Sequence, residues 1–242
     1  MRKTFPYQTL KENQRIKISV ASSSDRNVIY KIRHDVYGSE LQQHKQNERG
    51  ILKDQLDDVN IYFVAKIQEE IVGFISVTPP KEERYSIDKY ISRADYPFQV
   101  DGYLYEMRIL TVVRKHRKKP IAILLMQAAF RWIEAGGGKK IMAIGRLEVL
   151  DMYLKLGFKA IDQRIRSGSV DFELLYGDVS ELNLYIDKNY KELFTKLYTN
   201  CIWDLVISFF KPASCYHGGA FFDAIGVEFD NLYKRENIIN AD

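Results

Sequence analysis

Cysteine is scarce in this chain of 242 residues, which contains two, Cys201 and Cys215. Neither their number nor their spacing matches a metal-binding motif, so the sequence predicts no metal site. A disulfide between them is possible, but nothing in the sequence requires one. We predict free thiols in a reducing compartment.

Long apolar runs are also missing. No stretch is long enough to cross a bilayer, and residues 1–8 lack the apolar core of a secretory signal peptide. The sequence also has no internal repeat and no low-complexity tract. We therefore predict a cytoplasmic, soluble protein without a membrane span.

The chain carries little excess charge, with 36 Lys and Arg against 32 Asp and Glu and a net charge of +4. This is far from the composition of a dedicated nucleic-acid binder, so we expect no nucleic-acid partner. Hydrophobic residues make up 46% of the chain and aromatic residues 13%, which is enough to fill a sizeable core. Wholesale disorder is therefore excluded.

The hydrophobic pattern predicts an α/β order of elements. Strands are expected over residues 15–21, 61–67, 71–78, 103–113, 140–144, 158–165 and 170–176, with a hairpin turn at Gln68-Glu69-Glu70. Helices are expected after the possible caps at 22–25, from Pro120 to the glycines at 136–138, and over 148–156, where Gly157 would end the helix. The apolar face of the second helix would consist of Ile121, Leu124, Leu125, Ala128, Ala129 and Trp132. The first helix should turn an apolar face inward, formed by Val28, Ile29, Ile32, Val36 and Tyr37.

A domain boundary is expected near residue 177, with a main domain over 1–176. Asp178-Val-Ser-Glu181 reads as a capping box that opens a helix through about residue 200. Its apolar face would consist of Leu182, Ile186, Tyr190, Leu193, Leu197 and Cys201. Residues 177–242 are thus interpreted as a helical C-terminal extension or connector.

A dense basic loop separates the strand at 103–113 from the helix that follows. Six consecutive side chains, Arg114 to Lys119, can carry positive charge where the helix N-terminus begins. Helix N-termini favour anions, so the loop indicates a ligand that bears phosphate. The alternative is a solvated loop, which is the more common fate of a charged run.

Three segments resemble the GNAT superfamily of acyl-CoA-dependent N-acyltransferases: Glu106–Val112, Arg117–Ala122 and Leu150–Phe158. The resemblance covers about residues 15–176 and implies the GNAT fold, a mixed central sheet flanked by helices. In the family, the loop Arg/Gln-x-x-Gly-x-Gly/Ala holds the pyrophosphate of coenzyme A with backbone amides. Pro120 replaces the first glycine here and removes one amide donor, which shifts phosphate binding toward side-chain charge.

The resemblance also implies the catalytic residues. Tyr153 would protonate the departing thiolate, and its alternative role is packing. Glu106 would act as a general base toward the incoming amine, and its alternative is to orient the amine or pair with Arg108. His116 is expected to contact phosphate or solvent rather than act as a base. Contacts with the acyl donor would involve Leu110, Val112, Arg117, Lys118, Lys119, Ile121 and Ala122.

A narrower resemblance is carried by Arg33-x-x-x-Tyr37, Asp54–Asp58, Tyr62–Ala65 and Gly73–Pro79. These segments are similar to acyl-homoserine-lactone synthases and N-acyl amino acid synthases. In that branch, the amino-substrate side of the site is built from the positions of Arg33, Asp54 and Asp57, to which we add Arg108. The alternatives are loop solvation and helix capping for the two aspartates, and a place on the polar edge of the first helix for Arg33.

Two positions depart from the lactone synthases. Ser76 and Ile109 stand where those enzymes carry arginines. This favours an acyl amino acid synthase over the synthesis of a lactone from S-adenosylmethionine.

We therefore expect an N-acyltransferase without a metal. Its donor would be acyl-CoA, acetyl-CoA or acyl carrier protein, and its acceptor an amino-acid-like amine. An acidic carrier protein could dock on the basic loop. A roomy apolar pocket between split strands would favour a medium or long acyl chain. A pocket closed by bulky side chains would favour acetyl-CoA with a small amine or protein as acceptor.

Two other classes compete with this expectation. The missing loop glycine at Pro120 supports a GNAT-fold binding module without turnover. Nucleic-acid binding through the basic loop is weaker, because no aromatic residues are interleaved with the cations. Residues 212–242 could lead into a further domain, such as a pyridoxal-phosphate aminotransferase-like enzyme, or could be an ordinary extension.

Overall fold

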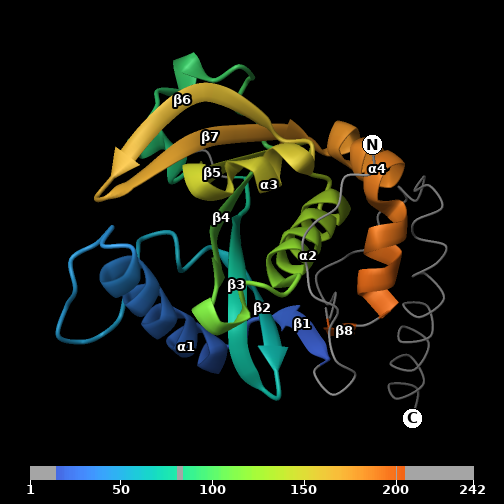
Figure 1. Ribbon diagram of the computed structural model, residues 1–242. Helices are drawn as coiled ribbons and strands as arrows, with labels where there is room; N and C mark the ends of the chain where they lie inside the picture. Colours follow the sequence, from blue (N-terminus) through green and yellow to red (C-terminus); the bar gives the residue numbers. More distant parts are fainter. Residues whose placement is uncertain (1–14, 81–83, 200, 205–242) are drawn as a thin grey trace, which may run out of the picture. The chain divides into compact units, whose positions relative to one another are not determined.

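A single mixed sheet organises the part of the chain that the structure describes. The structure is a computed structural model and describes residues 15–80, 84–199 and 201–204. Across these residues the strand order is β6-β7-β5-β4-β3-β2-β1-β8 (Figure 1). The strands are β1 (Ile16–Val20), β2 (Ile61–Ile67), β3 (Glu70–Thr78), β4 (Leu104–Val112), β5 (Lys140–Arg146), β6 (Lys159–Ser167), β7 (Val170–Asp178) and β8 (Cys201–Asp204).

Helices cover the sheet on both faces, as the sequence predicts. The α-helices are α1 (Ser23–Arg33), α2 (Ile121–Ala135), α3 (Leu150–Lys155) and α4 (Val179–Thr199), and α1 continues as a π-helix, η1 (His34–Glu40). Short 3₁₀ turns are η2 (Ile87–Lys89), η3 (Arg93–Asp95), η4 (Arg114–His116) and η5 (Leu147–Val149). Helix α2 connects β4 to the parallel strand β5.

Two apolar clusters lie on the face of the sheet that α1 covers. Ile29 and Tyr30 of α1 pack with side chains of β2 and β3. Residues 85–96 contribute Tyr85 and Ile87 to a second cluster with Leu104 of β4. Residues 85–96 are thus held by burial and short 3₁₀ turns rather than by a regular helix.

Helix α2 lies very close to β3 on the opposite face. A side chain at Gly73 would meet a methyl group of Ile121 at 2.9 Å, so the glycine permits this approach. Trp132 of α2 makes edge contacts with the rings of Phe63 and Tyr105. The predicted apolar face of α2 is therefore confirmed.

The predicted turn and cap are confirmed as well. Gln68 and Glu69 join β2 to β3 with positive φ angles of 51° and 63°, a pair that suits a two-residue hairpin. Ser22 caps α1 in a reciprocal capping box with Asp25. Gly157, with φ of 101°, ends α3 as expected.

Three local expectations are wrong. Val28 is 44% exposed, because α1 turns Ile29, Tyr30 and a buried arginine, Arg33, toward the sheet instead. Helix α2 begins at Ile121, one residue later than predicted.

The third wrong expectation concerns Cys201. It does not continue α4 but starts β8, which pairs in parallel with β1. Burial raises the pKa of its thiol to about 12, so it is protonated at neutral pH. Cys215 and the proposed lead into a further domain lie outside the described residues.

Candidate active site

Strands β4 and β5 are paired at one end and separate toward the other. Their parallel pairing covers Leu104–Met107 of β4. Beyond that, β5 remains paired with β7 to Arg146, whereas β4 remains paired with β3 to Val112. In the described part of the chain, β4 therefore has no strand neighbour on this side, and an extended ligand can pair with its backbone there.

A bulge bends β4 where the split opens. Ile109 has φ of 55°, which a β-branched residue seldom adopts. The register with β3 shifts between Phe74 and Ser76, opposite this part of β4. Bulges re-aim side chains and are common next to active sites. Arg108, which directly precedes Ile109, lies at this bend.

Tyr153 lies on the β5 arm of the split. Its ring atoms are 3.0 and 3.1 Å from where Gly145 of β5 would carry a side chain, so the glycine makes room for the ring. The ring also meets Phe158 edge-on. Burial raises the pKa of the Tyr153 hydroxyl, and Tyr37 contributes to the rise. The phenol is therefore protonated at neutral pH and can serve as a proton donor.

Tyr37 lies on the β4 arm, a position that sequence reasoning did not predict. It projects from the π-helix η1, and its hydroxyl is 3.0 Å from that of Thr111 on β4. Wide turns of this type are frequent at functional sites. The signal in the sequence was its inclusion in the Arg33-x-x-x-Tyr37 pattern, which did not distinguish packing from a site role.

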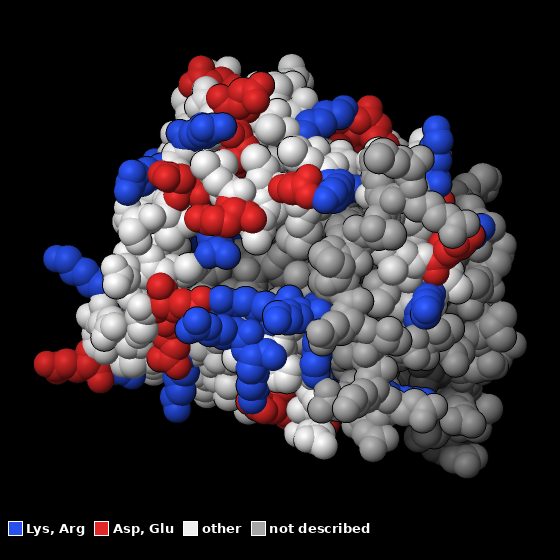
Figure 2. Space-filling model, viewed as in Figure 1, with Lys and Arg blue, Asp and Glu red and all other residues white. Residues whose placement is uncertain are grey.

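The basic loop leads from β4 into the N-terminus of α2. No side chain among the described residues caps this end of α2, so its first N–H groups are available to an anion. Figure 2 shows Lys and Arg side chains gathered over the loop between β4 and α2, beside a hollow in the surface. Ile121 is buried at the start of the helix and Ala122 is partly exposed next to it.

Two cations of this loop are already paired. Arg117 binds Glu40 of η1 through both terminal nitrogens, and its Nε donates to the carbonyl of Val112 at 3.0 Å. Lys115 binds Glu70 at 2.7 Å. Burial lowers the pKa of His116, helped by Lys119 and Lys115, so this ring is neutral at pH 7. The positive charge open to a ligand is therefore smaller than the six residues indicate.

We expect Lys118→Ala to raise the KM for a coenzyme A thioester about 10- to 150-fold with little change in kcat. Lys118 is exposed, and the loss of one charged hydrogen bond to phosphate costs about 1.5–3 kcal/mol. Lys115→Ala is the matched control, since Lys115 is occupied by Glu70. Equal effects of the two substitutions, in steady-state kinetics at low salt, would argue for diffuse attraction rather than a defined phosphate contact.

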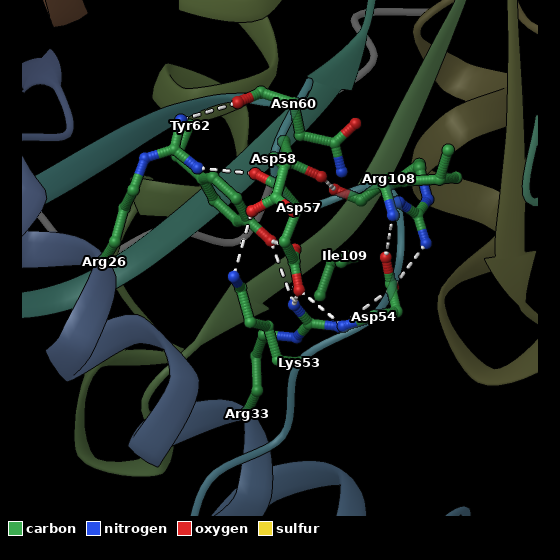
Figure 3. Close-up of polar contacts among 12 residues, drawn as sticks. Arg26, Arg33, Lys53, Asp54, Asp57, Asp58, Asn60, Tyr62, Arg108 and Ile109 are labelled. Carbon is green, nitrogen blue, oxygen red and sulfur yellow. Dashed lines mark hydrogen bonds and ion pairs between the residues drawn. The ribbon is translucent and has the colours of Figure 1, made fainter.

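The four residues predicted for the amino-substrate side come together as one ion cluster (Figure 3). Arg33 donates from Nη1 to both oxygens of Asp57 at 2.7 and 2.8 Å, and from Nη2 to Asp54 at 3.1 Å. Arg108 donates to the same Asp54 oxygen at 2.8 Å. Asp54 therefore bridges two arginines that come from α1 and β4.

The two aspartates differ in exposure. Asp57 is fully buried and also accepts hydrogen bonds from the Tyr62 hydroxyl and the Asp54 amide. Asp54 is 27% exposed, so the cluster reaches the surface there. Burial raises the pKa of Asp54, but Arg108 and Arg33 outweigh it and lower the pKa to about 2. Each aspartate also accepts a nearby amide, so local capping and ion pairing occur together.

Glu106 lies on the same face of β4 as Arg108 and is fully buried. Its carboxylate accepts the amides of Ser86 at 2.8 Å and Ile87 at 3.1 Å, as well as the Ser86 hydroxyl. The Nε of Arg108 is 3.9 Å away, which is an ionic contact rather than a hydrogen bond. Burial raises the pKa of Glu106, and Arg108 and these hydrogen bonds offset the rise only in part.

An apolar cavity lies behind Met107, on the α2 face of the sheet. It encloses about 20 Å³, room for one water molecule. Its walls are Met107, Ile123, Met126, Gln127, Phe130, Leu156, Phe158, Leu182, Ile186 and Phe194. Bulky side chains thus close the space, and an acyl chain would enter only if flexible residues such as the two methionines moved.

Tyr153 and the ion cluster stand on opposite arms of the split, and Tyr153 shares no hydrogen bond with Glu106. Leu110 and Val112 are partly exposed on the β4 arm.

No cluster of potential metal ligands occurs among residues 15–80, 84–199 and 201–204. In the same ranges, every helix is too short or too polar to cross a membrane.

The chain is similar to several solved acyltransferases. The CoA-dependent acyl-homoserine lactone synthase BjaI, with SAM and isopentyl-CoA, has a TM-score of 0.61 at 17% identity over 78% of this chain and 93% of its own. The lactone synthase LasI has a TM-score of 0.60 at 10% identity over 74% and 95%. FeeM, an N-acyl amino acid synthase from uncultured soil microbes, has a TM-score of 0.57 and 16% sequence identity. The match covers 75% of this chain and 98% of FeeM.

At such identities the likeness shows the fold alone. A comparison with curated proteins found no significant match. The sequence profile of the acetyltransferase (GNAT) family, however, matches residues 26–158, more than half of the chain. Profile and fold agree, and the protein therefore belongs to the GNAT family of acyltransferases.

Proposed function

We propose that the protein is an N-acyltransferase that moves an acyl group from an acyl thioester to the amine of an amino-acid-like acceptor. The observation that carries the proposal is the split between β4 and β5, which has a protonated, buried Tyr153 on one arm and a buried ion cluster on the other. The names of FeeM, an N-acyl amino acid synthase, and of BjaI, a CoA-dependent synthase, support this combination of acceptor and donor.

The donor binds along β4 and at the N-terminus of α2. The uncapped amides of α2 and the side chain of Lys118 bind its phosphates, while Lys119 adds charge and Arg117 holds the loop to η1. The extended arm of the donor pairs with the free side of β4 near Leu110 and Val112. An acyl carrier protein offers the same phosphate-bearing arm, and its acidic surface suits the basic loop.

The reaction is a direct transfer. The neutral amine attacks the thioester carbonyl carbon, a C–N bond forms and the C–S bond breaks. Glu106 takes a proton from the ammonium group, directly or through water, and Tyr153 gives its proton to the departing sulfur. Arg33, Asp54 and Asp57 hold the acceptor side in place. Holding donor and amine together contributes a large part of the rate.

A second candidate differs in the donor. The closed cavity behind Met107 favours a short acyl group such as acetyl in the conformation observed. The acceptor would then be a small amine or a protein amine. The choice between donors depends on whether the cavity opens.

The experiment is a thiol-release assay on the whole chain with acetyl-CoA, a long-chain acyl-CoA and a long-chain acyl carrier protein, each with pooled amino acids. Thiol release that depends on the acceptor supports the proposal, and the donor used decides the chain length. Tight donor binding, measured by calorimetry, without release from any donor would instead favour a binding module.

The pH dependence tests Glu106. Because its pKa is raised above the ordinary value of 4.5, the basic form is gained as pH rises through that higher value, and kcat/KM should rise with it. Glu106→Gln should remove this rise and lower kcat about 100-fold. Glu173→Gln, at a buried carboxylate on β7, is the control. A variant that loses stability but keeps the pH profile would show that Glu106 only holds Ser86 and Ile87.

A further inference from the structure

Arg108 has hydrogen-bonding capacity that none of the described residues uses. Its side chain is 8% exposed, and its Nη2 donates to Asp54. Its Nε and Nη1 are buried and have no hydrogen-bond partner in the described part of the chain. A buried guanidinium with unused N–H groups is costly, and such groups call for an oxygen acceptor.

The unused groups suit a carboxylate in particular. Nη2 has two protons, and one hydrogen bond to Asp54 uses one of them. Whichever edge of the guanidinium Asp54 occupies, the other edge still offers two parallel N–H groups. That fork matches the two oxygens of a carboxylate. Glu106 does not fill it, because its oxygen remains 3.9 Å from Nε.

The position of Arg108 connects it to the chemistry. It is the first residue of β4 beyond the pairing with β5, and it lies in register with Ser76, whose hydroxyl donates to its carbonyl. It shares a face with Glu106, two residues earlier on the strand. In an α-amino acid a single carbon separates the carboxylate from the amine. An acceptor bound at Arg108 would therefore present its amine close to Glu106.

We propose that Arg108 binds the α-carboxylate of the acceptor and so selects amino acids over simple amines. The proposal rests on the acyl transfer proposed above and names the acceptor class. Asp54 fixes the Arg108 guanidinium from one side. Asp57 does not contact Arg108 itself and acts as a positioning residue, through Arg33 and Asp54. Ser76 lies opposite Arg108 on β3 and Ile109 follows it on β4, and neither side chain carries a charge that would compete for a carboxylate.

The test compares acceptors that differ only in the carboxylate. Phenylalanine is paired with phenethylamine, leucine with 3-methylbutylamine and lysine with cadaverine, in thiol-release kinetics with the donor that works best. We expect the wild type to favour the best amino acid over its amine by at least about 100-fold in kcat/KM. Equal rates for the members of each pair would overturn the proposal without any variant being made.

Variants then assign the preference to Arg108. Arg108→Gln should bring the ratio close to one with the donor KM unchanged, and Arg108→Lys should retain part of it. Lys53→Gln, which removes an exposed cation near the same cluster, should leave the ratio intact. A full preference retained in Arg108→Gln would refute the proposal.

A binding measurement distinguishes failure of this proposal from failure of acyl transfer itself. If no acceptor releases thiol, binding is measured by the shift in Tm with phenylalanine and with phenethylamine. A shift with phenylalanine alone that Arg108→Lys reduces would still support carboxylate binding. The absence of a difference between the two ligands would reject it.

Discussion

Tyr153→Phe should lower kcat by about 10²–10⁴-fold while the KM for the donor changes little. This is the range by which a positioned general acid accelerates a reaction, and the ring that packs on Gly145 and Phe158 is retained. The measurement is steady-state thiol release together with calorimetric donor binding. Tyr103→Phe, at a tyrosine that is 48% exposed, is the control for loss of a hydroxyl elsewhere.

The pH profile adds a second test of Tyr153. Because its pKa is raised above the ordinary value of 10.0, the protonated form persists to higher pH, and kcat should show no alkaline fall near pH 10 that is due to this group. A rate for Tyr153→Phe within threefold of the wild type would exclude the general-acid role. Tyr37→Phe should then be examined, since that hydroxyl lies on the opposite arm of the split.

Asp57→Asn should lower the free energy of unfolding by about 3–5 kcal/mol, the cost of leaving one partner of a buried ion pair without its counter-charge. Asp57 is fully buried and joins Arg33, Tyr62 and the Asp54 amide. Urea unfolding monitored by circular dichroism measures the change. The neighbouring Asp58→Asn is the matched control, because this exposed partner of Lys53 should contribute little to stability.

A double variant separates charge burial from other effects. Arg33→Met combined with Asp57→Asn removes both charges, so it should recover part of the stability that Asp57→Asn alone loses. It should not recover activity, because Asp54 and Arg108 lose the support of Arg33. A double variant less stable than the sum of the two single effects would contradict a paired-charge explanation.

Sequence patterns predicted the elements in which local and tertiary preferences agree. The hairpin of β2 and β3, the capped start of α1 and the end of α3 at Gly157 follow from apolar runs and turn chemistry. Pattern alone could not predict η1. Its wide turn contains Gly38 and Ser39 and has no apolar period. Contacts of Tyr37 with Thr111 and of Glu40 with Arg117 hold it.

The sequence suggested the members of the candidate site but not the contacts among them. The family resemblance pointed to Arg33, Asp54 and Asp57, and periodicity would have assigned Arg33 to solvent. Asp54 bridges Arg33 and Arg108. This contact depends on the pairing of β3 with β4 and on the bulge at Ile109, which a sequence pattern does not reveal. Similarly, the run of cations from Arg114 did not reveal that Glu40 and Glu70 neutralise part of it.

Strand β8 sets the width of the sheet. It lies parallel to β1, with Lys17 and Asp204 joined by a 3.0 Å ion pair. Without it, β1 would present a row of free amides and carbonyls, the kind of edge that recruits strands from other molecules. β8 itself is only four residues long and ends in a charged side chain, which makes it a poor template for another strand. Among the described residues, two segments that are far apart in the sequence thus cover the β1 edge of the sheet against pairing with another molecule.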